Sequence, residues 1–132
     1  MESIQLLTRK RASCTDLLTC LYDLKDTELD ILFEVARSQS TLDEISEAVK
    51  KDRSTVHRAL SKLVSLDLVY KRVRSLKNGG YYHVYTIAEE SKIRDNAKLK
   101  VREITESLER LTDNFIPDFR KHLENRSSVS KF

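Results

Sequence analysis

The sequence predicts a mainly helical protein with one small β-hairpin, an α+β chain. Apolar residues recur at helical spacing over most of the 132 residues. The only two glycines, Gly79 and Gly80, stand side by side between two segments rich in β-branched and aromatic residues. After them comes a heptad pattern of apolar residues, which is typical of a long helix. We therefore expect several short helices, then a hairpin, then a long C-terminal helix.

The composition indicates one domain with an appendage, because charged residues make up 34% and apolar residues 39% of the chain. No apolar run approaches the ~18–20 residues of a membrane span. The N-terminus lacks the apolar region of a signal peptide, so the cytoplasm is the expected compartment. Cys14 and Cys20 are interpreted as reduced thiols, with a redox sensor as the alternative. Because the histidines add no ligand spacing, we expect no metal and no cofactor.

Two helices are expected before residue 40. A leucine stripe predicts the first, from Asp16 to Leu24, and Asp26 or Thr27 can cap the second, which ends near Ser38. The apolar side of the second helix would be Leu29, Ile31, Leu32, Val35 and Ala36.

A helix–turn–helix is predicted next. Thr41-Leu42-Asp43-Glu44 is a capping box, in which Thr41 accepts from the Glu44 N–H while Glu44 bonds back. The turn ends at Asp52, which can cap a helix from Arg53 to about Leu66. One side of this second helix is apolar at the spacing i, i+3, i+4, i+7, i+8, namely Val56, Ala59, Leu60, Leu63 and Val64.

The opposite side of that helix is short and polar, or basic, and it has no acid before Asp67. A surface helix with a purely structural role would normally mix in Asp and Glu to form i, i+4 pairs. Positive charge continues into the hairpin, since Lys50 to His83 hold nine Lys/Arg and two Asp/Glu, a net +7, against +3 for the whole chain. Such a surface suits a polyanion, and duplex DNA is the leading candidate.

The C-terminal helix is expected from Glu89 to about Phe115. Its apolar residues are separated by steps of 4, 3, 4, 3 and 4, which is a heptad seam. The seam either packs onto the domain's own first helix or pairs with a second copy, and we favour the homodimer. Pro117 should kink or end the helix. The expected dimerisation residues are Ala97, Val101, Ile104, Leu108, Leu111 and Phe115.

These patterns divide the chain into four parts. They are an N-terminal extension over residues 1–14, a DNA-binding domain over residues 15–88, a dimerisation helix over residues 89–124, and a flexible tail over residues 125–132.

The order helix, helix, basic-faced helix and hairpin resembles a winged helix-turn-helix. Residues 24–87 are similar to the DNA-binding domain of prokaryotic, especially archaeal, regulators of the TrmB and MarR type, most specifically in DRSTVHRALSKLVSLDLV. The resemblance implies a homodimer that places a recognition helix in each of two successive major grooves, with the wings on the flanking minor groove or backbone. It assigns no effector, because the 132 residues hold no counterpart of the sugar-binding domain of longer TrmB proteins.

The resemblance also implies roles for single residues. Those near the start of the recognition helix would face base edges, with Arg58 the best candidate for a guanine contact. Later residues of the helix would face phosphates, and the wing would add its own contacts. The expected DNA-binding residues are Arg53, Ser54, Thr55, His57, Arg58, Ser61, Lys62, Arg72, Arg74 and Lys77.

The prediction is a sequence-specific transcriptional regulator that binds double-stranded DNA. An alternative is a winged helix that binds other proteins, although such domains often have a neutral or acidic recognition face. An enzyme is not expected, because the sequence shows no nucleophile–base pair, no paired carboxylates and no phosphate-cradling glycine loop.

Overall fold

The predicted fold class is confirmed by a computed structural model, which describes residues 2–130, with side chains for residues 5–126. The chain forms two compact units, residues 1–95 and residues 96–132. Helices and one antiparallel hairpin make up the described chain. In order they are α1 (Glu2–Thr8), α2 (Cys14–Tyr22), α3 (Asp26–Arg37), α4 (Leu42–Val49), α5 (Arg53–Ser65), β1 (Val69–Ser75), β2 (Tyr81–Ile87), α6 (Glu90–Asp113) and α7 (Phe115–Ser130).

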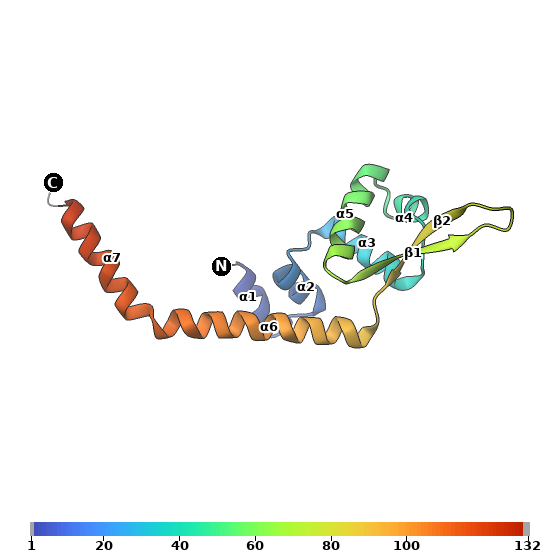
Figure 1. Ribbon diagram of the computed structural model, residues 1–132. Helices are drawn as coiled ribbons and strands as arrows, with labels where there is room; N and C mark the ends of the chain where they lie inside the picture. The colour runs from blue at the N-terminus through green and yellow to red at the C-terminus, as the bar shows by residue number, and fades with distance from the viewer. Residues whose placement is uncertain (1, 131–132) are drawn as a thin grey trace. The chain divides into compact units, whose positions relative to one another are not determined.

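The core of the first unit lies where α3, α4 and α5 pack against the base of the hairpin (Figure 1). Each helix contributes its apolar stripe, as the sequence predicts, and Ala36 alone of the expected α3 set is exposed. Leu18 and Leu21 of α2 and Ile93 of α6 pack against this core from outside. Its fully buried members are Leu24, Ile31, Val35, Ile45, Val56, Leu60, Leu63, Leu68 and Val69.

Helix starts follow the capping rules, with one difference. The capping box of α4 is confirmed: the Glu44 N–H donates to the Thr41 hydroxyl at 3.2 Å, and the Thr41 N–H donates to Glu44 at 2.9 Å. On α3 neither expected cap is used. Asp26 is already helical, and the N–H of Lys25, the N-cap residue, donates to Glu28 at 2.9 Å.

Two left-handed residues shape the connections around α5. Lys50 has a φ of 57° between α4 and α5, and Asp67 has a φ of 61° between α5 and β1. At the first turn the Lys51 N–H donates to the Ser46 carbonyl at 3.2 Å, which closes the C-terminus of α4. Neither position is glycine, so both left-handed conformations are maintained by the local hydrogen bonds and packing.

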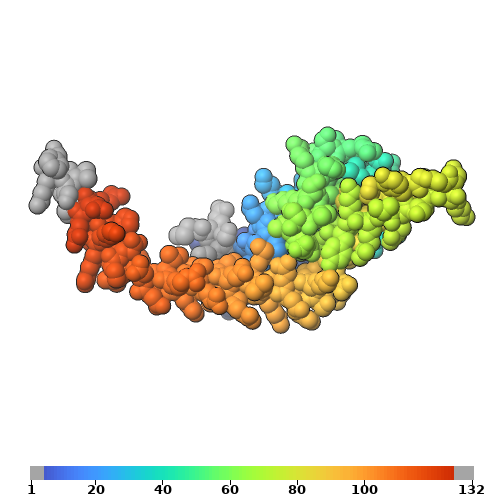
Figure 2. Space-filling model, in the orientation of Figure 1, coloured from blue at the N-terminus to red at the C-terminus, as the bar shows by residue number. Residues whose placement is uncertain are grey.

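The hairpin has the predicted position and turn. β1 pairs with β2 from Val69↔Ile87 to Ser75↔Tyr81. Gly79 and Gly80 have φ of +88° and +81°, a region that side chains disfavour, which explains the double glycine. Ser40 adds an isolated bridge to Tyr85, with N–O distances of 3.2 and 2.8 Å, and so ties the segment before α4 to the hairpin. The hairpin tip protrudes beyond the helices (Figure 2).

Both ends of the chain contain more helix than predicted. Residues 2–8 of the expected extension form α1. The long helix α6 ends at Asp113, before Pro117. Pro117 lies in the first turn of α7, where backbone N–H groups have no partner within the helix, so its missing N–H costs no hydrogen bond. Residues 125–130 of the expected tail continue α7, and residues 131 and 132 lie outside the described chain. In the described part no helix is long and apolar enough to cross a bilayer.

Candidate nucleic-acid interface

The polar side of α5 is exposed, as its amphipathic pattern predicts. Within the described chain, Ser54, His57, Arg58 and Ser61 are exposed and make no hydrogen bond or ion pair. The buried side of the same helix anchors it through Val56, Ala59, Leu60 and Leu63. A rigid helix therefore presents four uncommitted polar side chains, among them a guanidinium, to a ligand.

The first turn of α5 is internally bonded. The Thr55 hydroxyl donates to the Asp52 carboxylate and holds the pKa of that carboxyl below its usual value. Asp52 occupies the N-cap position, but its side chain makes no capping bond to the helix backbone. Thr55 is half-buried. It therefore helps to stabilise the start of α5 and also lies near the exposed side of the helix.

Arg53 begins α5 and is ion-paired with Asp43, which stands in the first turn of α4. Both side chains are 69% exposed, so the pair lies open to solvent. Arg53 thus has an ion-pair partner on the same surface. Arg58 has no ion pair within the described chain, although its charge helps to lower the pKa of Asp52.

Lys62 is directed away from the other polar residues of α5. Its ammonium lies 2.9 Å from the Glu28 carboxylate and donates to the Asp23 carbonyl at 2.7 Å. Partial burial raises the pKa of Glu28, but bonds from the Lys25 N–H and from Lys62 outweigh it and lower that pKa overall. Lys62 therefore joins α5 to α3, and its predicted phosphate contact stays a prediction that requires this pair to open.

The hairpin carries its cations on two faces, because side chains alternate along a strand. Lys71 is paired with Tyr85, and Val73 is paired with His83, so these four share one face. Arg72 and Arg74 of β1 belong to the opposite face. The two arginines predicted as wing contacts are therefore separated by the sheet from Lys71 and His83.

Arg72 and Arg74 are partly committed to their own domain. Arg72 donates to the Thr86 hydroxyl at 3.3 Å and stacks 5.3 Å from the centroid of the Tyr70 ring. Arg74 donates to the Gln39 side chain at 3.3 Å. Lys77 lies in the turn and, within the described chain, makes no hydrogen bond or ion pair. Lys77 is therefore the least constrained of the three residues predicted as wing contacts.

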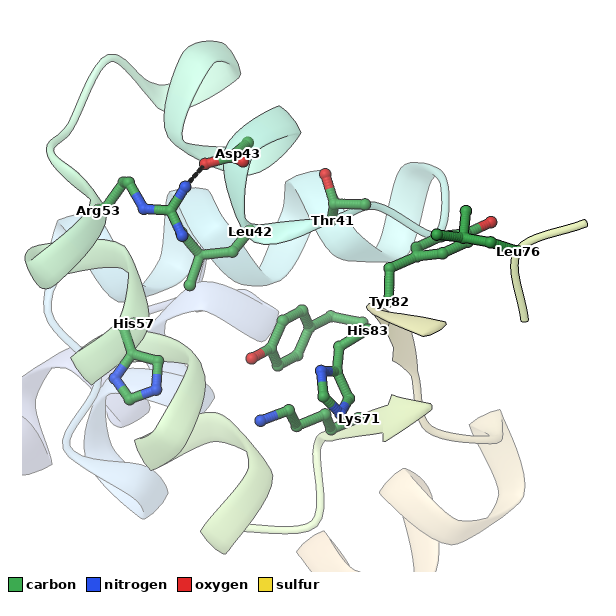
Figure 3. Close-up of a pocket in the computed structure, with 10 residues that line it drawn as sticks. Thr41, Leu42, Asp43, Arg53, His57, Lys71, Leu76, Tyr82 and His83 are labelled. Atoms are coloured by element: carbon green, nitrogen blue, oxygen red, sulfur yellow. Dashed lines mark hydrogen bonds and ion pairs between the residues drawn. The ribbon is translucent and has the colours of Figure 1, made fainter. Parts of the chain in front are cut away.

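An open groove of about 640 Å³ separates α5 from the hairpin (Figure 3). Arg53 and His57 stand on the α5 side, whereas Lys71 and His83 stand on the hairpin side. Its other lining residues are Thr41, Leu42, Asp43, Leu76, Tyr82 and Tyr85.

Lys71 and His83 line this groove but are not among the DNA-binding residues predicted from the sequence. Side-chain alternation along each strand places Lys71 on the same face as Val73, and His83 on the same face as Tyr85. Which hairpin face turns to α5 depends on how the strands pack against the core, and no local pattern contains that information. The core contact of Val69 and Tyr85 decides it here.

Comparison with known families decides the broad identity. The family model described as "Sugar-specific transcriptional regulator TrmB" matches residues 18–91, more than half of the chain. The chain belongs to the TrmB family of transcriptional regulators. The matched segment contains the α5 face, the hairpin and the groove, and it ends before the apolar seam of α6.

A relative of this TrmB-family chain is found in Methanocaldococcus jannaschii. The chain is 34% identical over 70 residues to the uncharacterized protein MJ1503 of Methanocaldococcus jannaschii, in a match covering 52% of this chain and 53% of that protein. The match thus spans about half the length of that relative.

Two solved structures share the fold of this TrmB-family chain. One is described as a possible transcriptional regulator from Methanosarcina mazei; it has a TM-score of 0.69, 21% identity, and coverage of 82% of this chain and 95% of that one. The other is the ST1889 protein of Sulfolobus tokodaii, with a TM-score of 0.59, 22% identity, and coverage of 71% and 93%.

Proposed function

We propose that this TrmB-family chain is a homodimeric regulator that binds a specific double-stranded DNA sequence. In each copy α5 enters a major groove, and the hairpin lies on the flanking backbone or minor groove. The observation that carries the proposal is the exposed side of α5. It holds Arg58, Ser54, His57 and Ser61, and it includes no acidic residue. Such a face can bind base edges and phosphates, whereas an acid would be repelled by the phosphates.

Arg58 is the proposed base-reading residue. Its guanidinium is exposed and unpaired within the described chain, and α5 holds it on a buried apolar stripe. An arginine can donate two hydrogen bonds to one guanine, which discriminates against other bases by about 1–3 kcal/mol. Ser54 and His57 stand beside it and complete the proposed base-facing set.

The proposed dimer interface is the seam of α6, which begins at Ala97 and is continued by Phe115 at the start of α7. Val101, Ile104, Leu108, Leu111 and Phe115 are 43%, 46%, 54%, 68% and 57% exposed. A stripe of large apolar side chains that the chain leaves uncovered favours a partner, and the heptad spacing suits a second copy of the same helix. Dimerisation would give two copies of α5 for two successive half-sites.

A selection experiment tests the DNA proposal. Duplexes bound by the protein would be selected from a random pool, and affinity for the selected site would be measured by fluorescence anisotropy at several salt concentrations. We expect affinity to fall as salt rises, because phosphate contacts release counterions. Arg58→Ala should weaken binding to the selected site and reduce the sequence preference at one base pair. An unchanged affinity and preference would exclude base reading by Arg58.

Arg37→Ala is a matched control for that substitution. Arg37 ends α3, is exposed and forms an i, i+3 pair with Glu34. The control removes the same charge from the chain outside the proposed interface. A protein partner instead of DNA would be indicated by the absence of salt-dependent binding to any duplex.

A further inference from the structure

Two of the three histidines of this chain line one groove. His57 belongs to α5 and His83 to β2, and both face the space between the recognition helix and the hairpin (Figure 3). The third, His122, lies on α7 in the other unit and contacts the Asp118 carbonyl at 2.9 Å. The pairing of His57 with His83 comes from the fold, since they are far apart in sequence.

The groove is rich in basic side chains. They are Arg53, His57, Lys71 and His83, and its one acid, Asp43, is ion-paired with Arg53. Within the described chain, the side chains of His57, Lys71 and His83 make no hydrogen bond or ion pair, although the His83 ring contacts Tyr81 edge-on at 5.8 Å. Three donors with no protein acceptor therefore converge on a concave surface.

We infer that this groove is a binding site for the phosphate groups of one DNA strand, and that protonation of His57 and His83 strengthens the binding. This inference rests on the proposed function, because it takes α5 to lie in the major groove and the hairpin beside it. The strand between a major groove and its neighbouring minor groove would then pass through the space between these two elements. Lys71 supplies a permanent charge there, and the two imidazoles supply a conditional one.

The chemistry of the lining explains why the ligand is a phosphodiester. A phosphate oxygen accepts hydrogen bonds from ammonium and imidazolium groups, and these charge-assisted bonds are stronger than neutral ones. The side chains come from two elements, so they can contact successive phosphates from opposite sides.

The pH dependence follows from the types of group in the groove. The titratable groups that line it are Asp43, Arg53, His57, Lys71, Tyr82, His83 and Tyr85. Arg58 also faces His57, because both line the adjoining hollow on α5. Of these side-chain types, only imidazole ordinarily changes charge between pH 5 and 8. Bound phosphate favours imidazolium over imidazole, so DNA should bind more tightly as the pH falls through that range. At a histidine whose pKa rises by one unit on binding, the gain approaches tenfold.

The test compares affinity for one duplex at pH 8 and pH 5.5, at constant ionic strength, by fluorescence anisotropy. The wild-type chain should bind several-fold more tightly at the lower pH, with a gain approaching about tenfold for each imidazole whose pKa rises by one unit on binding. His57→Gln and His83→Gln should each reduce this ratio, and the double variant should bring it close to one. Lys71→Gln should weaken binding at both pH values and leave the ratio unchanged, because both imidazoles are still present.

His122→Gln is the matched control, since it removes a histidine outside the groove and should keep the wild-type ratio. Circular dichroism and melting temperature at both pH values would show whether the variants remain folded. A double variant that is folded and keeps the full pH ratio would overturn the inference, as would a wild-type ratio near one. Failure of the wild-type chain to bind any duplex at either pH would instead overturn the proposed function.

The salt dependence gives a second readout. Each phosphate contact made by a protonated histidine should add about 0.9 to the slope of log affinity against log salt. The wild-type slope should therefore be steeper at pH 5.5 than at pH 8, and the double variant should show equal slopes. Unequal slopes in the double variant would assign the pH effect to other residues and contradict the inference.

Discussion

The ammonium of Lys62 on α5 lies 2.9 Å from the carboxylate of Glu28 on α3. The two side chains are 31% and 16% exposed, so water screens the pair only in part. Lys62 also donates to the Asp23 carbonyl after α2. One side chain of the recognition helix therefore connects it to two other segments of the domain.

Replacing Lys62 should lower stability more than it lowers DNA affinity. Lys62→Gln leaves a partly buried carboxylate without its cation, which we expect to cost about 1–2 kcal/mol, less than the loss of a fully buried pair. Urea unfolding followed by circular dichroism measures the change. Ser61→Ala, at the exposed neighbouring position, should be close to neutral. A stable Lys62→Gln protein with a large loss of DNA affinity would restore the phosphate role of Lys62.

Glu28 should make the domain sensitive to acid. Its folded pKa lies below the usual 4.5, so its contribution to stability is complete above that value and is lost as the pH falls through the folded pKa. Glu28→Gln should therefore flatten the decline in unfolding free energy below pH 4.5. Glu47→Gln, which removes an exposed acid of α4, is the control. Equal acid profiles for Glu28→Gln and wild type would contradict this assignment.

The capping box of α4 should support the helix–turn–helix. Thr41→Ala removes the oxygen that accepts from the Glu44 N–H and should cost about 1 kcal/mol of unfolding free energy. Thr41→Ser keeps that oxygen and should retain most of the stability. Chemical denaturation of the three proteins measures both effects. If serine and alanine destabilise equally, the hydroxyl bond is not the source of the effect.

The seam of α6 should control the oligomeric state. Leu108→Asp places a charge in the middle of the exposed stripe, and we expect it to convert the dimer to a monomer at micromolar concentration. Light scattering after size exclusion gives the mass. Leu99→Asp is the control, because Leu99 is 51% exposed on α6 but lies off the heptad seam. A monomeric wild-type protein would refute the dimer directly.

Local sequence was enough to predict most elements of the first unit. The capping box at Thr41, the apolar stripe of α5 and the double glycine of the hairpin each describe interactions within a few residues, so a sequence pattern contains them. The C-terminal elements were less well predicted. Pro117 predicts a kink or an end of the long helix, and α6 does end nearby, at Asp113. That a new helix begins at Phe115 with Pro117 in its first turn was not predicted, because a proline there loses no hydrogen bond.

The local sequence predicts a basic-faced helix and a basic hairpin after a helix–turn–helix, because amphipathic periodicity and turn chemistry are local. Which basic side chains come together depends on the tertiary structure. It brought His57 and His83 to one groove, turned Arg72 and Arg74 to the other face of the sheet, and directed Lys62 to Glu28. Each of these arrangements depends on how buried side chains of distant segments pack in the core, and their positions in the sequence do not determine that packing.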